Sequence, residues 1–242
     1  AKLITEESCE DIELEIQRIN PAALIIELPS NPMLKCINIR KISKIAHKLN
    51  IPVIVDDTIG SNFNINSLEY ADIVFTSLTK IFSGSGDILA GSLILNPKSK
   101  WIDSFRNSLK EINLPKLSDG DIISLEKVSR DVKQRVFEQN KACLELKKRL
   151  ENHRQIKSIF HPENCPNFNS LLNSNGGYGC LLSFELNGGL DKAKQFYDSL
   201  KISKGPSLGT KFTLVCPYVL LAQYDELDWA ASFGLPSHLI RV

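Results

Sequence analysis

The chain has 242 residues, of which 43% are hydrophobic and 24% are charged, and its formal net charge is +1. This balance argues against a strongly basic nucleic-acid surface and gives no electrostatic reason to expect an anionic membrane as partner. The sequence contains no run of 18 or more apolar residues, so no transmembrane helix is expected.

The beginning of the chain, AKLITEESCEDIELEI, lacks a basic segment followed by an apolar one, so it does not resemble a secretory signal. Six scattered cysteines and four unclustered histidines show no metal-ligand spacing, and we expect no metal site. The cysteines are therefore expected to be reduced thiols in a cytoplasmic protein. The chain starts without Met and stops inside an apolar run, which indicates a piece of a longer protein, truncated at both ends.

The first half of the chain alternates predicted helices with predicted strands. Residues 7–19 and 37–49 have amphipathic helical spacing. Residues 22–28 form a continuous apolar run, which suits a strand buried on both faces and ended by PSNP at 29–32. Three more strands are predicted at 51–57, 71–77 and 91–96. These intervals indicate an α/β domain with a largely parallel sheet.

The second half has a different pattern, which begins with helical apolar spacing over residues 119–150. This predicts a long helix, continuous or broken once, that is capped by Ser118 or Asp119 and leaves the first domain. The expected elements after it are a strand in 153–162, a loop at 167–179, a strand at 179–186, a helix at 190–200 and a strand with a glycine turn in 201–217. We therefore predict one domain in residues 1–118 and a linking helix with a smaller α+β domain in 119–242.

Polar residues follow three of the predicted strands, and ligands of open parallel sheets lie outside the carboxyl ends of the strands. Lys80 follows the strand ADIVF, where a desolvated crevice would lower its pKa. A neutral amine is what imine formation with an aldehyde requires. Ser77 and Thr79 could donate hydrogen bonds to a phosphate beside this lysine. Taken alone, the segment SLTK fits a solvent-exposed strand end better.

Asp56 adds a second signal at the end of the adjacent apolar strand. A carboxylate there is costly unless it pairs with a cation, and a protonated pyridine nitrogen is such a cation. The acid would keep that ring protonated, so that the ring acts as an electron sink. The alternative is a carboxylate that caps the next helix or pairs with Arg or Lys. Asp at one strand end with Lys at the next is typical of pyridoxal-phosphate (PLP) proteins of the aspartate-aminotransferase fold.

Two longer segments, 25–60 and 70–96, carry a resemblance to a known family. They contain ELPSNP, VDDT and SLTK followed by a glycine-rich stretch. This pattern resembles the E-x-P-x-N-P, V-D-N-T and S-x-T-K motifs of the Cys/Met-metabolism PLP enzymes. The later SLG and LIR extend the resemblance over most of the chain, and the wording is most similar to the fungal cystathionine γ-synthase-like branch. It implies a fold type I PLP-dependent transferase, with 1–118 as the C-terminal part of the PLP-binding large domain and 119–242 as the linking helix and an incomplete small domain.

The resemblance also implies roles around the cofactor. Lys80 matches the family's Schiff-base lysine, which moves protons after the substrate displaces it. Asp56 matches the acid at the pyridine nitrogen, and Asn31 matches an amide near the phenolic oxygen. Ser77 and Thr79 match hydroxyls that contact the phosphate.

Ser207 and Arg241 match the groups that hold the substrate α-carboxylate, a task for which the planar fork of Arg is suited. Glu27 belongs to the motif without a physical role that we can assign. Asp57 stands where the family commonly has Asn; it either adds negative charge near the cofactor or pairs with a nearby base. The family's phosphate loop, stacked tyrosine and neighbouring-subunit residues come from a part that would precede residue 1, so we expect the piece alone not to turn over.

The activity that the resemblance implies is γ-replacement, in which the thiol of cysteine displaces the ester of an activated homoserine and gives cystathionine. Elimination by a cystathionine γ- or β-lyase and direct sulfhydrylation, as in O-acetylhomoserine sulfhydrylase, remain open. So do a PLP aminotransferase of the same fold and a non-catalytic relative that serves as a binding or structural subunit. Amino-acid substrates and assembly into a homo-oligomer, a dimer or a tetramer, are expected from the resemblance alone.

Overall fold

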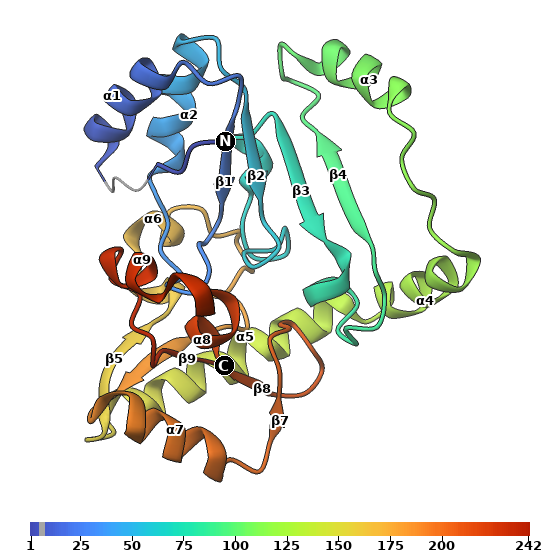
Figure 1. Cartoon of the computed structure of the whole chain (residues 1–242). Coiled ribbons are helices and arrows are strands. Elements are labelled where there is room, and N and C mark those ends of the chain that lie inside the picture. The colour runs from blue at the N-terminus through green and yellow to red at the C-terminus, as the bar shows by residue number, and fades with distance from the viewer. Residues whose placement is uncertain (5–7) are drawn as a thin grey trace.

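The computed structural model describes residues 1–4 and 8–242, which form two sheets (Figure 1). The first sheet has the order β1-β2-β3-β4. Strands β1 (Leu24–Glu27), β2 (Val53–Asp56) and β3 (Ile73–Ser77) are parallel, whereas β4 (Gly91–Leu95) runs antiparallel to β3. The largely parallel sheet predicted from the sequence is therefore confirmed. Its last strand reverses because no crossover helix separates β4 from β3, and a parallel pair requires one.

Helices α1 (Cys9–Ile19) and α2 (Ile39–Lys48) cover one face of this sheet. They confirm the helices predicted at 7–19 and 37–49; residue 7 lies outside the described residues. The Ser8 hydroxyl accepts a hydrogen bond from the Asp11 backbone N–H at 3.0 Å, which satisfies one free donor at the start of α1. Buried apolar side chains of both helices pack with Leu24, Val53 and Val55, and this cluster is the main core.

The opposite face of the sheet is more open. Ile25 is 72% exposed, so the prediction that 22–28 is buried on both faces is wrong. The reason is that α1 and α2 pack on one side only. Side chains alternate along a strand, and β1, β2 and β3 pair Ile25 with Ile54 and Ile54 with Ile73. The open face therefore also carries Asp56 and Ser77.

The predicted helix 119–150 is broken once, into α4 (Asp119–Ser129) and α5 (Val132–Glu151). The Ser118 hydroxyl accepts from the Asp121 N–H at 3.0 Å and caps α4, as one of the two expected caps. Helix α5 passes below the first sheet and runs alongside the second (Figure 1). It therefore contacts elements from both halves of the chain.

The second half forms a five-stranded sheet in the order β5-β6-β9-β8-β7. Neighbouring strands are antiparallel, except that β7 and β8 are parallel. The strands are β5 (Ile156–Phe160), β6 (Ser183–Leu186), β7 (Ser203–Lys204), β8 (Leu214–Pro217) and β9 (Ile240–Arg241). The expected strands in the second half are thus confirmed, and β9 adds an unpredicted central strand. The division of the chain into domains at 118/119 stays a prediction.

The remaining elements are shorter, apart from α7, which confirms the helix expected at 190–200. They are η1 (Ser67–Glu69), η2 (Leu78–Phe82), α3 (Ile102–Glu111), η3 (Pro162–Asn164), α6 (Pro166–Asn169), α7 (Gly189–Ser199), α8 (Tyr218–Ala222), η4 (Tyr224–Glu226) and α9 (Leu227–Ser232). No helix within the described ranges is long and apolar enough to cross a bilayer.

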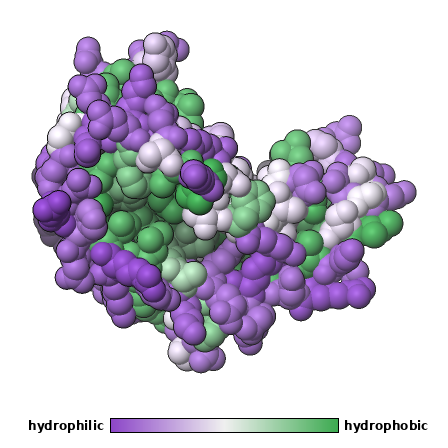
Figure 2. All heavy atoms as spheres, turned by 90° about the horizontal axis from the view of Figure 1, so that it is seen from below, coloured by the Kyte–Doolittle hydropathy of each residue, from purple (hydrophilic) through white to green (hydrophobic). Residues whose placement is uncertain are grey.

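The lower surface of the molecule is hollowed, and hydrophobic residues line the hollow between hydrophilic rims (Figure 2). A cavity of about 500 Å³ lies between α5 and the segment 207–214. Ser207 and Arg241 are among the residues that line it. The cavity therefore reaches two of the predicted site residues.

Candidate active site

Lys80 lies in a turn that directly follows β3. The turn η2 is interrupted at Lys80, whose φ of −89° and ψ of −115° are not helical. The Gly84 N–H donates to the Lys80 carbonyl at 2.9 Å, and the Leu78 N–H donates to the Ala90 carbonyl at 2.9 Å. Backbone hydrogen bonds thus fix both sides of the turn and hold Lys80 at the carboxyl end of the sheet.

The amine of Lys80 points toward the second half of the chain. Its Nζ donates to the Ser207 hydroxyl at 3.5 Å, across 127 residues of sequence. The segment around Ser207 approaches the lysine turn closely, because a Cβ built on Gly209 would lie 2.5 Å from the Ile81 nitrogen. Gly209 has a φ of +73°, so glycine meets both the backbone and the space requirement there.

Arg241 lies beside this segment with only 3% of its surface exposed. Its Nη1 donates to Asn31 Oδ1 at 3.0 Å, and its Nη2 donates to the carbonyls of Ser207, at 3.1 Å, and Pro206. The guanidinium also lies 4.5 Å from the centre of the Tyr218 ring. Among the described residues no carboxylate forms an ion pair with it, so a buried positive charge is available for an anionic ligand.

Asn31 connects this group to the first sheet. Its Nδ2 donates to the Tyr218 hydroxyl at 3.0 Å, and its backbone N–H donates to Glu27 Oε2 at 2.9 Å. Glu27 is thus a hydrogen-bond acceptor that orients the loop after β1. This is a structural role for the motif residue to which the sequence assigned none.

Asp56 stands in register between Glu27 on β1 and Phe75 on β3. Its Oδ1 accepts from the Thr58 N–H at 2.9 Å, and Thr58 Oγ1 accepts from the Ser77 N–H at 2.9 Å. Within the part of the chain that the structure describes, the carboxylate has no cationic partner. The alternative that Asp56 pairs with a described Arg or Lys is therefore wrong.

The two predicted phosphate hydroxyls differ in their surroundings. The Ser77 hydroxyl makes no hydrogen bond to any described residue. The Thr79 hydroxyl accepts from the Ala90 N–H at 3.2 Å and lies 3.4 Å from the Ala90 carbonyl. Ser77 is thus the hydroxyl that is free to bind a ligand, whereas Thr79 ties the lysine turn to the start of β4.

Asp57 is 1% exposed and accepts hydrogen bonds from the hydroxyls of Ser67, at 3.0 Å, and Thr76. Burial raises the pKa of this carboxyl, and the two hydroxyls act in the opposite direction. The alternative in which Asp57 pairs with a nearby base is therefore wrong, because its partners are hydroxyls.

The structure thus connects Lys80, Ser207, Arg241 and Asn31 through a continuous set of hydrogen bonds, with Asp56 and Ser77 on the adjoining sheet. Sequence reasoning missed Tyr218. The rule that polar residues following a strand are candidates, as applied to β1, would also have selected this residue, which directly follows β8.

A PLP group needs an amine for its aldehyde, an acid for its ring nitrogen and donors for its phosphate. The structure offers the Lys80 amine, an Asp56 carboxylate without a cationic partner in the described residues, and the unpartnered Ser77 hydroxyl. These residues fit the group. Fold and site together define a fold type I PLP-dependent enzyme. Over residues 1–242 the chain matches the family of Cys/Met metabolism PLP-dependent enzymes, and it belongs to that family.

Comparison with curated proteins gives fungal relatives. A cystathionine gamma-synthase of Neurospora crassa is 40% identical over 223 residues, which are 91% of this chain and 36% of the relative. One of Saccharomyces cerevisiae is 38% identical over 237 residues, with the same 91% and 36% coverage. The chain thus spans about a third of the length of these relatives.

Solved structures share the fold. A cystathionine gamma synthase from Xanthomonas oryzae pv. oryzae, in complex with aminoacrylate and cysteine, superposes with a TM-score of 0.84 at 22% identity, covering 98% of this chain and 62% of that one. A cystathionine gamma-lyase from Micromonospora echinospora has a TM-score of 0.81 at 24% identity, covering 97% and 62%. Both the synthase and the lyase have this fold, so the fold does not distinguish the two reactions.

Proposed function

We propose that the full-length protein is a PLP-dependent trans-sulfuration enzyme that joins the sulfur of cysteine to the γ-carbon of an activated homoserine ester and forms cystathionine. The observation that carries this proposal is the network in which the Lys80 amine, the Ser207 hydroxyl and the buried Arg241 guanidinium are linked. The choice of γ-replacement rests on the fungal relatives at 40% and 38% identity. PLP, when bound, supplies an aldehyde and a ring that stabilises negative charge at the substrate α-carbon.

In this proposal Lys80 both carries the cofactor and moves a proton at the α-carbon of the bound amino acid. Asp56 keeps the proton on the ring nitrogen, because a carboxylate favours the charged form of a nearby base. Ser77 donates its hydroxyl to the phosphate. Thr79 would do so only by giving up its contact with Ala90, so we assign it chiefly to shaping the turn.

Arg241 and Ser207 hold the substrate α-carboxylate. The guanidinium already uses Nη1 and Nη2 for Asn31 and the two loop carbonyls, which fixes the orientation of its plane. A fixed plane binds a carboxylate with less loss of side-chain freedom than a mobile one. Asn31 is then placed between this Arg and the cofactor, in agreement with the role proposed for its amide.

Homo-oligomeric assembly and a cytoplasmic location belong to the same proposal. They are supported by membership of the family, and the location also by the six free cysteines among the described residues. Sedimentation of the full-length protein tests the first, and fractionation of cells tests the second.

The test of the proposed function is covalent labelling of the full-length protein. Borohydride reduction should fix the pyridoxyl group on Lys80, as read by peptide mass spectrometry. Lys80→Ala should lose the label and the violet absorbance of the cofactor, and cystathionine formation should drop by at least about 10²-fold. The matched control is Lys133→Ala, which removes an exposed lysine of α5 and should behave as the parent. A label on another residue, or none, would contradict the proposal.

The same preparations separate the alternative reactions. Cysteine with O-succinyl- or O-acetylhomoserine should yield cystathionine, whereas a sulfhydrylase would accept sulfide and a lyase would release a keto acid from cystathionine. Transfer of an amino group to an added keto acid would identify an aminotransferase. A protein without any absorbance change on adding amino acids would be the non-catalytic relative.

A further inference from the structure

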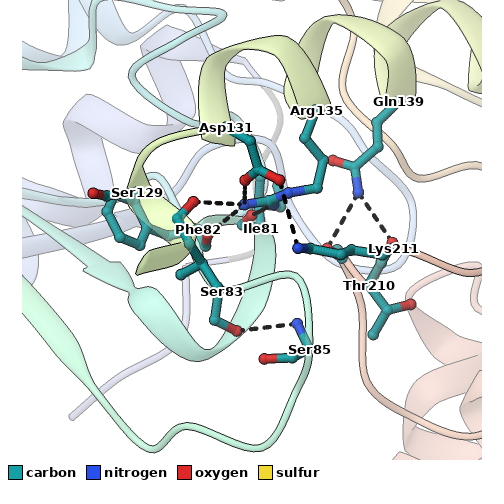
Figure 3. A network of polar contacts seen from close by, with 12 residues as sticks. Ile81, Phe82, Ser83, Ser85, Ser129, Asp131, Arg135, Gln139, Thr210 and Lys211 are labelled. Carbon is teal, nitrogen blue, oxygen red and sulfur yellow. Dashed lines mark hydrogen bonds and ion pairs between the residues drawn. The ribbon is translucent and has the colours of Figure 1, made fainter. Parts of the chain in front are cut away.

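Helix α5 presents two side chains, four positions apart, to the two segments that carry Lys80 and Ser207 (Figure 3). Arg135 Nη1 donates to the Ile81 carbonyl at 2.7 Å, and Nη2 donates to the Phe82 carbonyl at 2.9 Å. Both carbonyls directly follow Lys80. The two hydrogen bonds therefore hold the lysine turn from the side opposite to the sheet.

These carbonyls need a partner from outside the turn. The short helical turn ends at Ser83, and the last carbonyls of a helix lack the N–H groups of a following turn. The side chain of Arg135 is only 9% exposed, so the carbonyls that it serves have little access to water. It packs directly on Gly84, where an added Cβ would lie 2.7 Å from Nη1.

Gln139 does the same for the second segment. Its Nε2 donates to the carbonyls of Gly209 at 3.2 Å and Thr210 at 3.0 Å (Figure 3). The two segments also join each other, because the Lys211 N–H donates to the Gly84 carbonyl at 2.7 Å. One face of α5 therefore binds both the turn after Lys80 and the loop after Ser207.

We propose that Arg135 and Gln139 form a brace that sets the position of the Lys80 amine relative to the loop that binds the substrate carboxylate. Arg135 is a positioning residue for Lys80, and Gln139 is a positioning residue for the Ser207 loop. Arg suits the first place because its planar fork serves two carbonyls at once, whereas the ammonium of Lys is a single point donor. Naming these segments by their chemistry rests on the proposed function; the contacts themselves do not.

The experiment uses full-length protein and the variants Arg135→Gln, Arg135→Lys and Gln139→Ala. Matched controls are Arg149→Ala, whose Arg is 77% exposed and pairs only with Glu145, and Gln134→Ala, whose amide bonds only Glu138 on the same helix. Amide hydrogen exchange is followed in segments 78–86 and 205–211. The pH midpoint of the cofactor absorbance, kcat and KM are measured on the loaded enzyme.

Arg135→Gln should speed exchange in 78–86 by about tenfold or more, as expected when a buried carbonyl loses its partner. It should also shift the pH midpoint and lower kcat, with a smaller effect on KM for the amino acid. Gln139→Ala should speed exchange in 205–211 and raise KM, with the pH midpoint unchanged. Arg135→Lys should fall between Arg135→Gln and the parent, and both controls should match the parent.

Exchange like that of the parent in both segments would overturn the brace, whatever the activity. Faster exchange with an unchanged pH midpoint, kcat and KM would also overturn it, because the contacts would then be structural only. If Arg135→Gln fails to fold, Arg135→Lys and Gln139→Ala still decide the outcome. Absence of a label on Lys80 in the parent would instead refute the proposed function, while the exchange rates would still judge the contacts.

Discussion

Asp56 and Asp57 are neighbours in the sequence with opposite surroundings. Asp56 is partly exposed on the open face, and its nearest donor is a backbone N–H. Asp57 is 1% exposed and is surrounded by hydroxyls. Environment, rather than residue type, therefore gives one carboxylate a site for a cationic ring and the other a place in the core.

The raised pKa of Asp57 predicts a pH dependence of stability. The folded chain binds this proton more tightly than an unfolded Asp, whose pKa is about 3.9. The contribution to stability is therefore complete below that value and is lost as pH rises through the folded-state pKa. Asp57→Asn, which carries no charge, should remove this loss. The measurement is the free energy of unfolding in urea for parent and variant, from acid to neutral pH.

The control for this comparison is Asp103→Asn, because the Asp103 side chain is 88% exposed. Its stability should follow the parent across the whole pH range. Parallel curves for the parent and Asp57→Asn would mean that Asp57 titrates alike in the folded and unfolded chains.

At the scale of elements, the loop 206–211 and the turn η2 form a single packed unit through Gly209. Gly209→Ala should destabilise this unit, because a positive φ costs about 1–3 kcal/mol for other residues and the new methyl would meet the Ile81 backbone. We expect a lower melting temperature and weaker binding of amino-acid substrates. Gly189→Ala is the control, since Gly189 also has a positive φ but nothing within 4 Å of the added carbon. Equal effects of both changes would show that the contact with Ile81 is unimportant.

The main elements could be predicted from the sequence because each carries its own periodicity. Strands β1, β2 and β3 are short apolar runs between polar or glycine-rich segments, and α1 and α2 show a clear apolar stripe. Strand β9 could not be predicted, because its two residues form a strand only by pairing with β6 and β8. The open face of β1 was missed for a related reason: an apolar run does not tell which of its faces another element covers.

The site was predictable where it follows the ends of strands, as Asp56, Lys80 and Asn31 do. Ser207 and Arg241 came from the family resemblance alone, since nothing local links them to residues so distant in sequence. Arg135 and Gln139 could not be found, because a polar residue on a helix looks the same in sequence whether it faces water or a carbonyl 54 or 70 residues away.

At the scale of the whole molecule, the open sheet face is a further testable feature. Ile25 is 72% exposed and Leu93, on the same face, is 49% exposed. Exposed apolar surface favours association. The 242-residue chain expressed alone should therefore bind an apolar dye and self-associate, and Ile25→Glu should reduce both. Leu14→Glu, at a 63% exposed position on α1, is the control. Dye binding that Ile25→Glu leaves unchanged would place the association elsewhere.

The bond between Arg241 and Asn31 joins residues 210 positions apart, and the one between Lys80 and Ser207 spans 127 positions. Contacts of such sequence separation form late, because the chain between them must first be ordered. A ribosome therefore exposes the lysine while its anion-binding counterpart has not yet been translated. The nascent polypeptide carries a nucleophilic amine without a substrate pocket, and substrate recognition begins only when the final strand enters its sheet.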